Sequence, residues 1–286
     1  MSIINAVLQG VIQGLTEFLP VSSDGHLTLF QHFTGQSGEG SLMFTLLLHL
    51  GTLVSVFIVF RKTIWELIIE AFAMIRDIFT GKFSYKNANP TRKMIIMIFF
   101  SLIPLLVFYF VKDYFTMLAE DGDIIVEGVL FIFTGTMLFL ADRCTKGHKT
   151  ASEMKISDSL WIGTFQGLAA LPAVSRSGST MSVALLRGFS REYAVSFSFI
   201  MGIPAIIGAN IFEIKDAVEE AVSVEILPLL IGVLVSAVVG FFAIKLIKYL
   251  IETDRFVVFA YYTLALGIVT IGVGIYEHIF GRIIIG

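Results

Sequence analysis

The chain is short of charged residues and of cysteine, and each shortage excludes a class of protein. Only 15% of its 286 residues are Asp, Glu, Lys or Arg, while 56% are hydrophobic, so the chain is too apolar for an ordinary soluble domain. Its net charge of −3 is too small to indicate a nucleic-acid partner. The single cysteine, Cys144, cannot form an internal disulfide and lacks the partners of a Cys/His metal site.

Motifs of several other protein classes are absent as well. There is no G-x-x-x-x-G-K-[ST] phosphate loop, which argues against ATP use, and no repeated ring of charge that would suggest a channel. The N-terminus has no basic segment, and Gln9, Gln13 and Glu17 interrupt its apolar run. We therefore expect no removable signal peptide and a mature chain that starts at Met1.

Long apolar runs dominate the sequence. A transmembrane helix needs about 20 mostly apolar residues, and the runs that meet this need are 42–60, 94–111, 125–141, 193–212, 226–247 and 256–280. Segments 2–33 and 157–189 are also apolar but are interrupted by Gly, Pro, Ser and charge. Irregular backbone persists in a membrane only beside a cavity or protein interior, so we expect two re-entrant, broken helices there. The sequence predicts an all-α integral membrane protein with about six transmembrane helices and two re-entrant segments.

Basic residues predict which loops face the cytoplasm. Residues 61–93 carry seven Lys or Arg and residues 142–155 carry four, so the positive-inside rule makes both cytoplasmic, together with Lys245 and Lys248. The amphipathic stretch 63–79 is expected to lie along the inner surface. The loops expected outside are acidic and contain Glu120, Asp121, Asp123, Glu213, Asp216, Glu219, Glu220 and Glu225.

Two polar segments of the chain are copies of one another. Residues 13–27 read QGLTEFLPVSSDGHL and residues 166–180 read QGLAALPAVSRSGST, with identities at a constant spacing of 153. Three predicted spans separate the copies, and an odd number of crossings inverts the second one. We therefore predict one membrane domain made of two inverted repeats, about 1–120 and 154–286.

Inverted repeats with broken helices commonly place a binding site at the bilayer midplane, where helix N-termini offer N–H groups to an anion. In both copies a proline interrupts the helix. Gly25 and Gly178 permit close backbone approach, while Ser22 and Ser175 can cap the following helix and donate to an anion. An anion site between the two copies is the prediction.

The copies differ in their charged residues. Glu17 is the lone charge of its run, and an acid at the centre of a membrane helix costs about 2.5 to 3.5 kcal/mol. It is either a hydrogen-bonded structural residue or a metal ligand or general base. Gln13 lies one turn earlier on the same face and either shares a ligand with Glu17 or packs helices.

The first loop also holds groups that suit proton transfer. His26 can exchange a proton near neutral pH, and its place beside Ser22 and Ser23 favours a nucleophile within reach of a base. Asp24 fits a turn or cap equally well. His49, alone in an apolar span, is interpreted as a hydrogen-bonded core residue.

Arg176 is the charged residue of the second copy. Its guanidinium matches phosphate oxygens bidentately, although a structural salt bridge to Glu17 is the alternative. Ser175, Ser177 and Thr180 surround it with hydroxyl groups, a grouping that suits phosphoryl oxygens better than helix packing.

The combination of Gln13-x-x-x-Glu17, FLPVSSDGH and a later LPAVSRSGST resembles the bacterial undecaprenyl pyrophosphate phosphatase family, also known for bacitracin resistance. The resemblance covers the whole chain. It implies a multi-pass protein of the bacterial plasma membrane that hydrolyses a C55 isoprenoid diphosphate to the monophosphate for peptidoglycan synthesis. It also implies a divalent cation, usually Mg²⁺, with the lipid diphosphate and membrane lipid as partners.

Carried onto this chain, the resemblance makes Glu17 the residue that handles metal and water, Ser23 the nucleophile or a phosphate ligand, His26 the proton carrier and Arg176 the diphosphate clamp. Gln13 stands where the family accepts Glu or Gln. The chain departs from the family pattern at Asp24, where a small hydroxyl residue is common, and at Ala173, where glycine is.

Two other functions share features with this sequence. A transporter or flippase for a polyprenyl phosphate would share the inverted repeats, but it has no use for the grouping of Glu17, Ser23 and His26. A lipid phosphatase with a histidine nucleophile would need K-x6-R-P and His-x3-Asp elements, which are absent.

Overall fold

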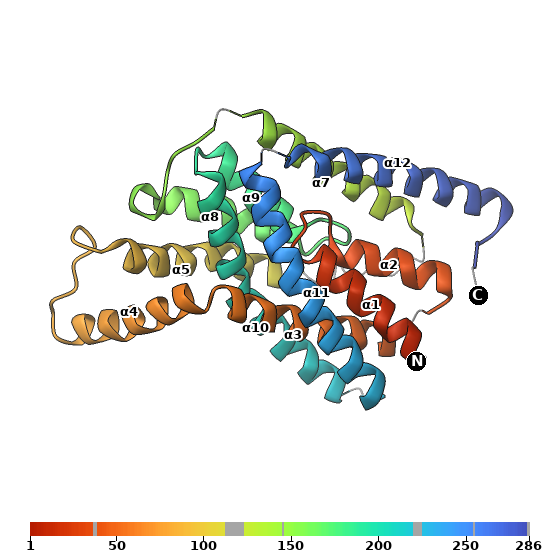
Figure 1. The fold of residues 1–286 in the computed structure, drawn as a ribbon, viewed down its shortest axis with the longest axis horizontal. Coiled ribbons are helices and arrows are strands. Elements are labelled where there is room, and N and C mark those ends of the chain that lie inside the picture. Colours follow the sequence, from red (N-terminus) through yellow and green to blue (C-terminus); the bar gives the residue numbers. More distant parts are fainter. Residues whose placement is uncertain (37–38, 112–122, 145, 220–224, 254, 285–286) are drawn as a thin grey trace.

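The computed structural model describes a helical chain over residues 1–36, 39–111, 123–144, 146–219, 225–253 and 255–284. Figure 1 shows a molecule built of helices, several of which cross in the middle of the view. The helices in chain order are α1 (Ile3–Thr16), α2 (Ser23–Thr34), α3 (Glu39–Val59), α4 (Arg61–Phe79), α5 (Pro90–Tyr109), α7 (Ile125–Arg143), α8 (Ile156–Leu168), α9 (Arg176–Leu186), α10 (Arg191–Glu219), α11 (Ile226–Glu252) and α12 (Val257–Phe280), with a short 3-10 turn at Ala151–Glu153.

The predicted spans correspond to helices of the right length and polarity. Five helices in the described part of the chain, α5, α7, α10, α11 and α12, are long and apolar enough to cross a membrane. The sixth predicted span, 42–60, is α3, which continues into α4 through a bend of 84°. The prediction of about six spans is therefore confirmed by length and composition.

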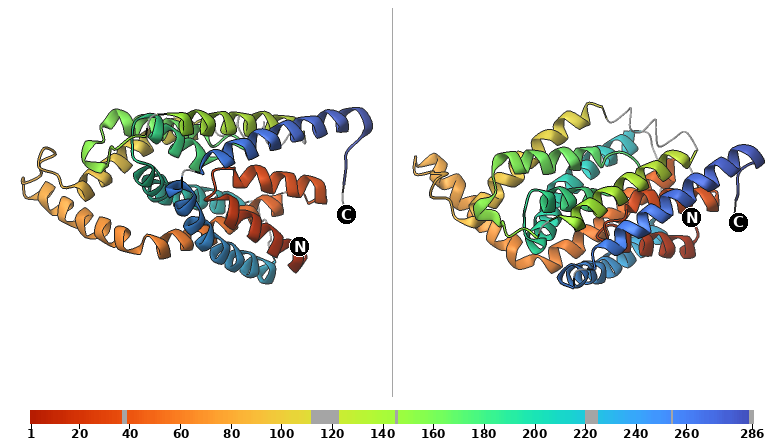
Figure 2. Two further views of the ribbon diagram at one scale, coloured as in Figure 1. Left: turned by 45° about the horizontal axis from the view of Figure 1, so that its top comes forward. Right: turned by 90° about the horizontal axis from the view of Figure 1, so that it is seen from above.

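Helix α4 is the amphipathic stretch predicted at 63–79. None of its side chains is buried, and Trp65 is 64% exposed. It pairs with α5 in an arm that Figure 2 shows extending away from the centre. Arg92 ties the arm together by ion pairs to Glu70 and Asp77. Its position on the inner membrane surface remains a prediction.

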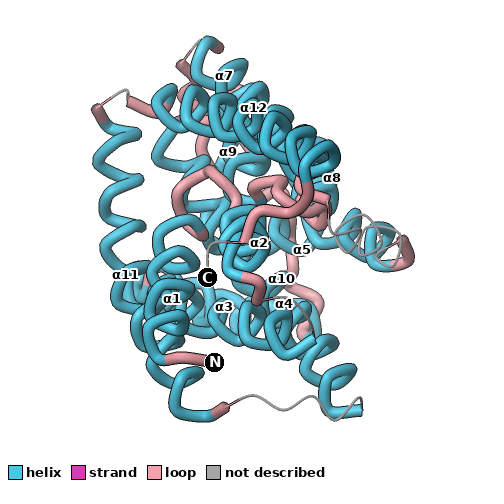
Figure 3. The backbone as a smooth tube through the Cα atoms, turned by 90° about the vertical axis from the view of Figure 1, so that its right-hand side faces the viewer, coloured by secondary structure: helices cyan, strands magenta, loops and turns pink. Residues whose placement is uncertain are grey.

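Both predicted broken segments are helical hairpins. Segment 2–33 forms α1 and α2, joined by a loop that contains Pro20, and segment 157–189 forms α8 and α9, joined by a loop that contains Pro172. The hairpin of α1 and α2 extends to the right of the centre in Figure 1, while α8 and α9 lie on the other side. In the tube of Figure 3 the connecting loops lie in the interior, among the helices.

The two halves of the chain exchange partners. Helix α1 of the first half packs on α11 of the second, and α8 of the second half packs on α5 of the first, while α7 and α12 pair with each other. A duplicated chain would produce such reciprocal contacts. The inversion of the second copy remains a prediction.

Charges that are distant in sequence gather as the topology prediction requires. Arg61 and Lys62 line the same pocket as Lys245 and Lys248. Elsewhere, the N-terminal ammonium group lies 3.2 Å from Glu225 Oε1. Of the predicted outer acids, Glu120, Asp121 and Glu220 lie outside the described residues.

Candidate active site

The loops of the two hairpins are built alike. Ser22 precedes α2 and accepts a hydrogen bond from the Gly25 N–H at 3.2 Å, and Ser175 precedes α9 and accepts one from the Gly178 N–H at 3.0 Å. These are matched positions of the two copies, so the predicted capping role of both serines is confirmed. Because each serine oxygen accepts this hydrogen bond, it fixes the residue at which the following helix begins.

The two loops touch each other through their glycines. A Cβ added to Gly25 would lie 2.8 Å from Cα and Cβ of Ala173 in the opposite loop, and one added to Gly178 would lie 3.2 Å from the carbonyl oxygen of Pro20. Ala173 itself has a φ of 59°, a left-handed conformation that favours glycine. This backbone conformation gives a physical reason for the glycine that is common at this position in the family pattern described above.

Glu17 lies where the loops meet, and groups from both hairpins bind it. Ser23 Oγ donates to Glu17 Oε2 at 2.8 Å, and Arg176 Nη2 donates to Glu17 Oε1 at 2.5 Å. Ser23 and Arg176 are the first residues of α2 and α9 and occupy matched positions in the two copies. Gln13 Nε2 adds a third hydrogen bond to Glu17 Oε2 at 3.0 Å. The carboxylate is 5% exposed, so this charge is held almost entirely by protein donors.

Two polar atoms of this cluster are buried without a hydrogen-bond partner. They are Gln13 Oε1 and Arg176 Nη1. Leaving a buried polar atom unpaired costs about 1–3 kcal/mol. Arg176 Nη1 is therefore suited to a ligand that brings an acceptor, and Gln13 Oε1 to a ligand that brings a donor or to a metal ion. Arg176 Nη1 faces Gly202 on α10, which leaves room for the guanidinium.

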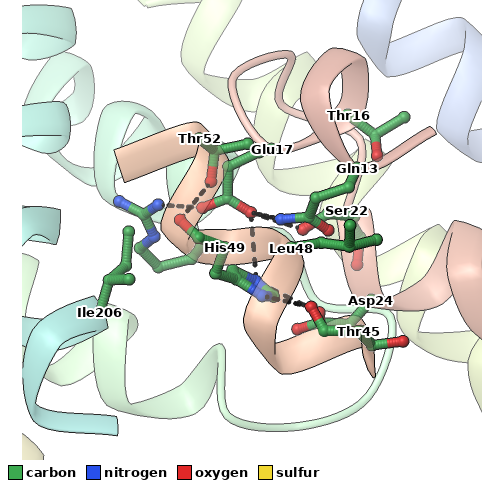
Figure 4. A network of polar contacts seen from close by, with 12 residues as sticks. Gln13, Thr16, Glu17, Ser22, Asp24, Thr45, Leu48, His49, Thr52 and Ile206 are labelled. Carbon is green, nitrogen blue, oxygen red and sulfur yellow. Dashed lines mark hydrogen bonds and ion pairs between the residues drawn. The ribbon is translucent and has the colours of Figure 1, made fainter. Parts of the chain in front are cut away.

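His49 belongs to the site although the sequence suggested only a core residue. Its Nε2 lies 3.4 Å from Glu17 Oε2 and 3.7 Å from Asp24 Oδ1, while its Nδ1 contacts the carbonyl oxygen of Thr45 at 3.1 Å. Figure 4 shows the imidazole below the Glu17 carboxylate, between it and Asp24. Because α3 crosses the first hairpin here, His49 links the buried acid to a more exposed one.

His26 lies apart from the Glu17 cluster. Its Nδ1 contacts the carbonyl oxygen of Ser22 at 2.7 Å, and its Nε2 contacts the hydroxyl of Tyr262 at 2.7 Å, with the two rings stacked. These contacts turn the imidazole toward α12. The structure therefore does not bring His26 to Ser23, and its role as a proton carrier remains a prediction.

The other predicted ligands of the second loop are engaged within the protein. Ser177 Oγ donates to the carbonyl oxygen of Glu17 at 3.3 Å, and the hydroxyl of Thr180 pairs with Ser198 Oγ at 2.6 Å. Both side chains are buried. These contacts anchor the start of α9 and thereby position Arg176.

Within the described part of the chain, no group of three or more His, Cys, Asp or Glu side chains has the geometry to hold a metal ion without other ligands. Mg²⁺ commonly binds through one or two carboxylates together with substrate phosphate oxygens. Glu17 and the unpaired Oε1 of Gln13 fit such a partial donor set.

Comparison with known proteins places the chain in a family. A family model described as bacitracin resistance protein BacA matches residues 6–269. The chain belongs to this family. An undecaprenyl-diphosphatase of Alkaliphilus metalliredigens is 42% identical over 95% of this chain and 98% of its own length. An undecaprenyl-diphosphatase of Carboxydothermus hydrogenoformans is 37% identical over 94% and 96%, and undecaprenyl-diphosphatase 4 of Bacillus thuringiensis is 36% identical over 98% and 100%.

Proposed function

We propose that the chain is an undecaprenyl-diphosphatase of the plasma membrane, which converts undecaprenyl diphosphate to undecaprenyl phosphate and inorganic phosphate. Its BacA relatives have that name, and the chain matches them over nearly their whole length. The observation that supports the chemistry is the buried Glu17 carboxylate, which accepts a hydrogen bond from a hydroxyl of one hairpin and another from a guanidinium of the other.

Ser23 and Glu17 have the arrangement of a nucleophile and its base. The hydroxyl already donates to the carboxylate at 2.8 Å, so its proton can pass to Glu17 when Ser23 Oγ attacks the terminal phosphorus. The new O–P bond forms as the bridging P–O bond breaks, and undecaprenyl phosphate leaves. Water then hydrolyses the phosphoserine and releases inorganic phosphate.

Arg176 supplies positive charge for the diphosphate. One of its terminal nitrogens binds Glu17 and the other, Nη1, is unpaired. A phosphoryl oxygen can take this free donor, which places the guanidinium where negative charge develops. His49 then keeps the position of the Glu17 carboxylate fixed through its second oxygen.

Glu17 and Gln13 would hold a divalent cation together with the substrate, and Mg²⁺ is the ion we propose. When bound, it would neutralise charge on the phosphoryl oxygens. Gln13 would supply a neutral amide oxygen to the ion, whereas Glu17 would supply a charged one.

The experiment that tests this proposal is inorganic phosphate release from undecaprenyl diphosphate by the purified protein in detergent, with and without EDTA. We expect metal-dependent release by the wild type and none by Glu17→Gln. No release from folded wild type would contradict the enzyme and favour a transporter, which lipid movement in vesicles would then reveal.

A further inference from the structure

A basic pocket lies at the bend between α3 and α4, on surface that the Glu17 site does not use. It has a volume of about 500 Å³, within the range of ligand sites. The residues lining this basic pocket are Ile58, Val59, Phe60, Arg61, Lys62, Thr63, Glu192, Ser196, Phe241, Lys245 and Lys248. Cations from α4 and α11 thus converge on one cavity with a single acidic residue in its wall.

Three of these cations are available for a ligand. Within the described residues, no acidic side chain lies within ion-pair distance of Arg61, Lys62 or Lys245. Lys245 lies with its Nζ 4.3 Å from the centroid of the Phe241 ring. Phe60 precedes α4 without a side-chain cap, so the positive end of that helix also faces this region. The pocket therefore attracts an anion.

The basic pocket is separated from the Glu17 site by packed aromatic rings. Phe60, in the pocket wall, contacts Phe199 edge-on with 6.1 Å between centroids, and Phe199 contacts Phe18 at 5.3 Å. All three are buried, and Phe18 is the neighbour of Glu17. An anion in the pocket thus has a site of its own, independent of the proposed reaction.

The surroundings of the pocket indicate which anion it takes. Its wall combines cations with apolar side chains, and the neighbouring residues Ile58 and Phe242 are 46% and 62% exposed on helices of membrane-spanning character. A phosphate group would lie against Arg61, Lys62 and Lys245, while an attached hydrocarbon chain could lie along α3 and α11. We propose that the basic pocket binds the phosphate headgroup of an anionic membrane phospholipid at the inner side of the membrane.

Tryptophan fluorescence can test this with the full-length protein. The chain has two tryptophans, and Trp161→Phe leaves Trp65, which lies one helical turn after Arg61 on the same face of α4. The protein is placed in phosphatidylcholine vesicles that contain either dibrominated phosphatidylglycerol or dibrominated phosphatidylcholine. We expect stronger quenching of Trp65 by the brominated phosphatidylglycerol at equal mole fraction.

Charge-matched variants show whether the pocket causes the preference. Because a basic residue near an anionic surface contributes about five-fold in affinity, Arg61→Gln with Lys245→Gln is expected to reduce the preference by about 25-fold. The control is Lys82→Gln with Lys86→Gln, which removes the same charge from exposed positions outside the pocket. Both double variants should keep wild-type phosphate release in detergent, which verifies folding.

Three results would overturn the proposal. One is equal quenching by the two brominated lipids in the wild type, and another is an equal loss of preference in the two double variants, which would indicate general surface charge. The third is an unchanged preference in Arg61→Gln with Lys245→Gln, because the cations of the basic pocket would then not bind the headgroup.

Discussion

Gly202 gives a way to move Arg176 without altering any group that touches the substrate. A Cβ built on Gly202 lies 2.0 Å from Arg176 Nη1 and 2.9 Å from its Cζ. Ordinary contact begins at 3.4 Å, so in Gly202→Ala the guanidinium must retreat by about 1.4 Å. The atom that moves is the end of a flexible side chain, so the helix itself can stay in place.

The size of the effect follows from this displacement. Misplacing a catalytic group by about 1 Å can lower the rate about 100-fold, which corresponds to about 2.7 kcal/mol of lost transition-state stabilisation. Folding should be little affected, since alanine in a helix interior is favoured over glycine by about 0.5–1 kcal/mol. We therefore expect kcat/KM for phosphate release to fall about 100-fold while the thermal unfolding temperature changes little.

Gly208→Ala is the matched control, because it makes the same change on α10 where an added Cβ meets nothing within 4 Å. It should keep wild-type activity and stability. If Gly202→Ala also kept full activity while folded, the position of the guanidinium would not matter for the reaction. Arg176 would then be the structural partner of Glu17 rather than a diphosphate ligand.

Three further substitutions test other parts of the site. Ser23→Ala should leave KM for the diphosphate nearly unchanged and abolish turnover and any acid-stable phosphoenzyme, whereas a rise in KM alone would make Ser23 only a ligand. His49→Gln should lower kcat about 10-fold to 100-fold by releasing one side of the Glu17 carboxylate, and an unchanged kcat would return His49 to the core. Gly25→Ala should destabilise the protein by about 1–3 kcal/mol, because its Cβ would lie 2.6 Å from Phe131 and 2.8 Å from Ala173. A thermal unfolding temperature equal to that of the wild type would contradict the contact between the loops.

The broken helices could be predicted because their causes are local. Proline removes a backbone donor, and serine caps the helix that follows, so QGLTEFLPVSSDGHL specifies a helix, a loop and a second helix wherever it lies in space. The pairing of Glu17 with Arg176 could be predicted as an alternative, since each is the main charged residue of its copy. The structure shows both residues in one contact.

The surroundings of two histidines could not be predicted, because they depend on how helices cross. His49 lies in an apolar run with no charged neighbour at helical spacing that would indicate a site, and only the packing of α3 near the first hairpin brings it to Glu17. His26 shares a loop with Ser23, but the start of α2 turns its ring toward Tyr262. Proximity in sequence therefore did not predict which residue His26 contacts, and the separation of His49 from the motif in sequence gave no sign of its contact with Glu17.

The chemistry of the site depends on the differences between the two copies. Ser23 and Arg176 begin matched helices and both bind Glu17, whose counterpart in the second copy is Ala170. A second serine in place of Arg176 would leave the buried carboxylate without its cation, and a second acid at Ala170 would add another negative charge near a diphosphate site. A pair of hairpins with identical loops could therefore fold in the same way. To hold an anion beside a buried base, however, one loop must carry the acid and hydroxyl of Glu17 and Ser23, and the other must carry the guanidinium of Arg176.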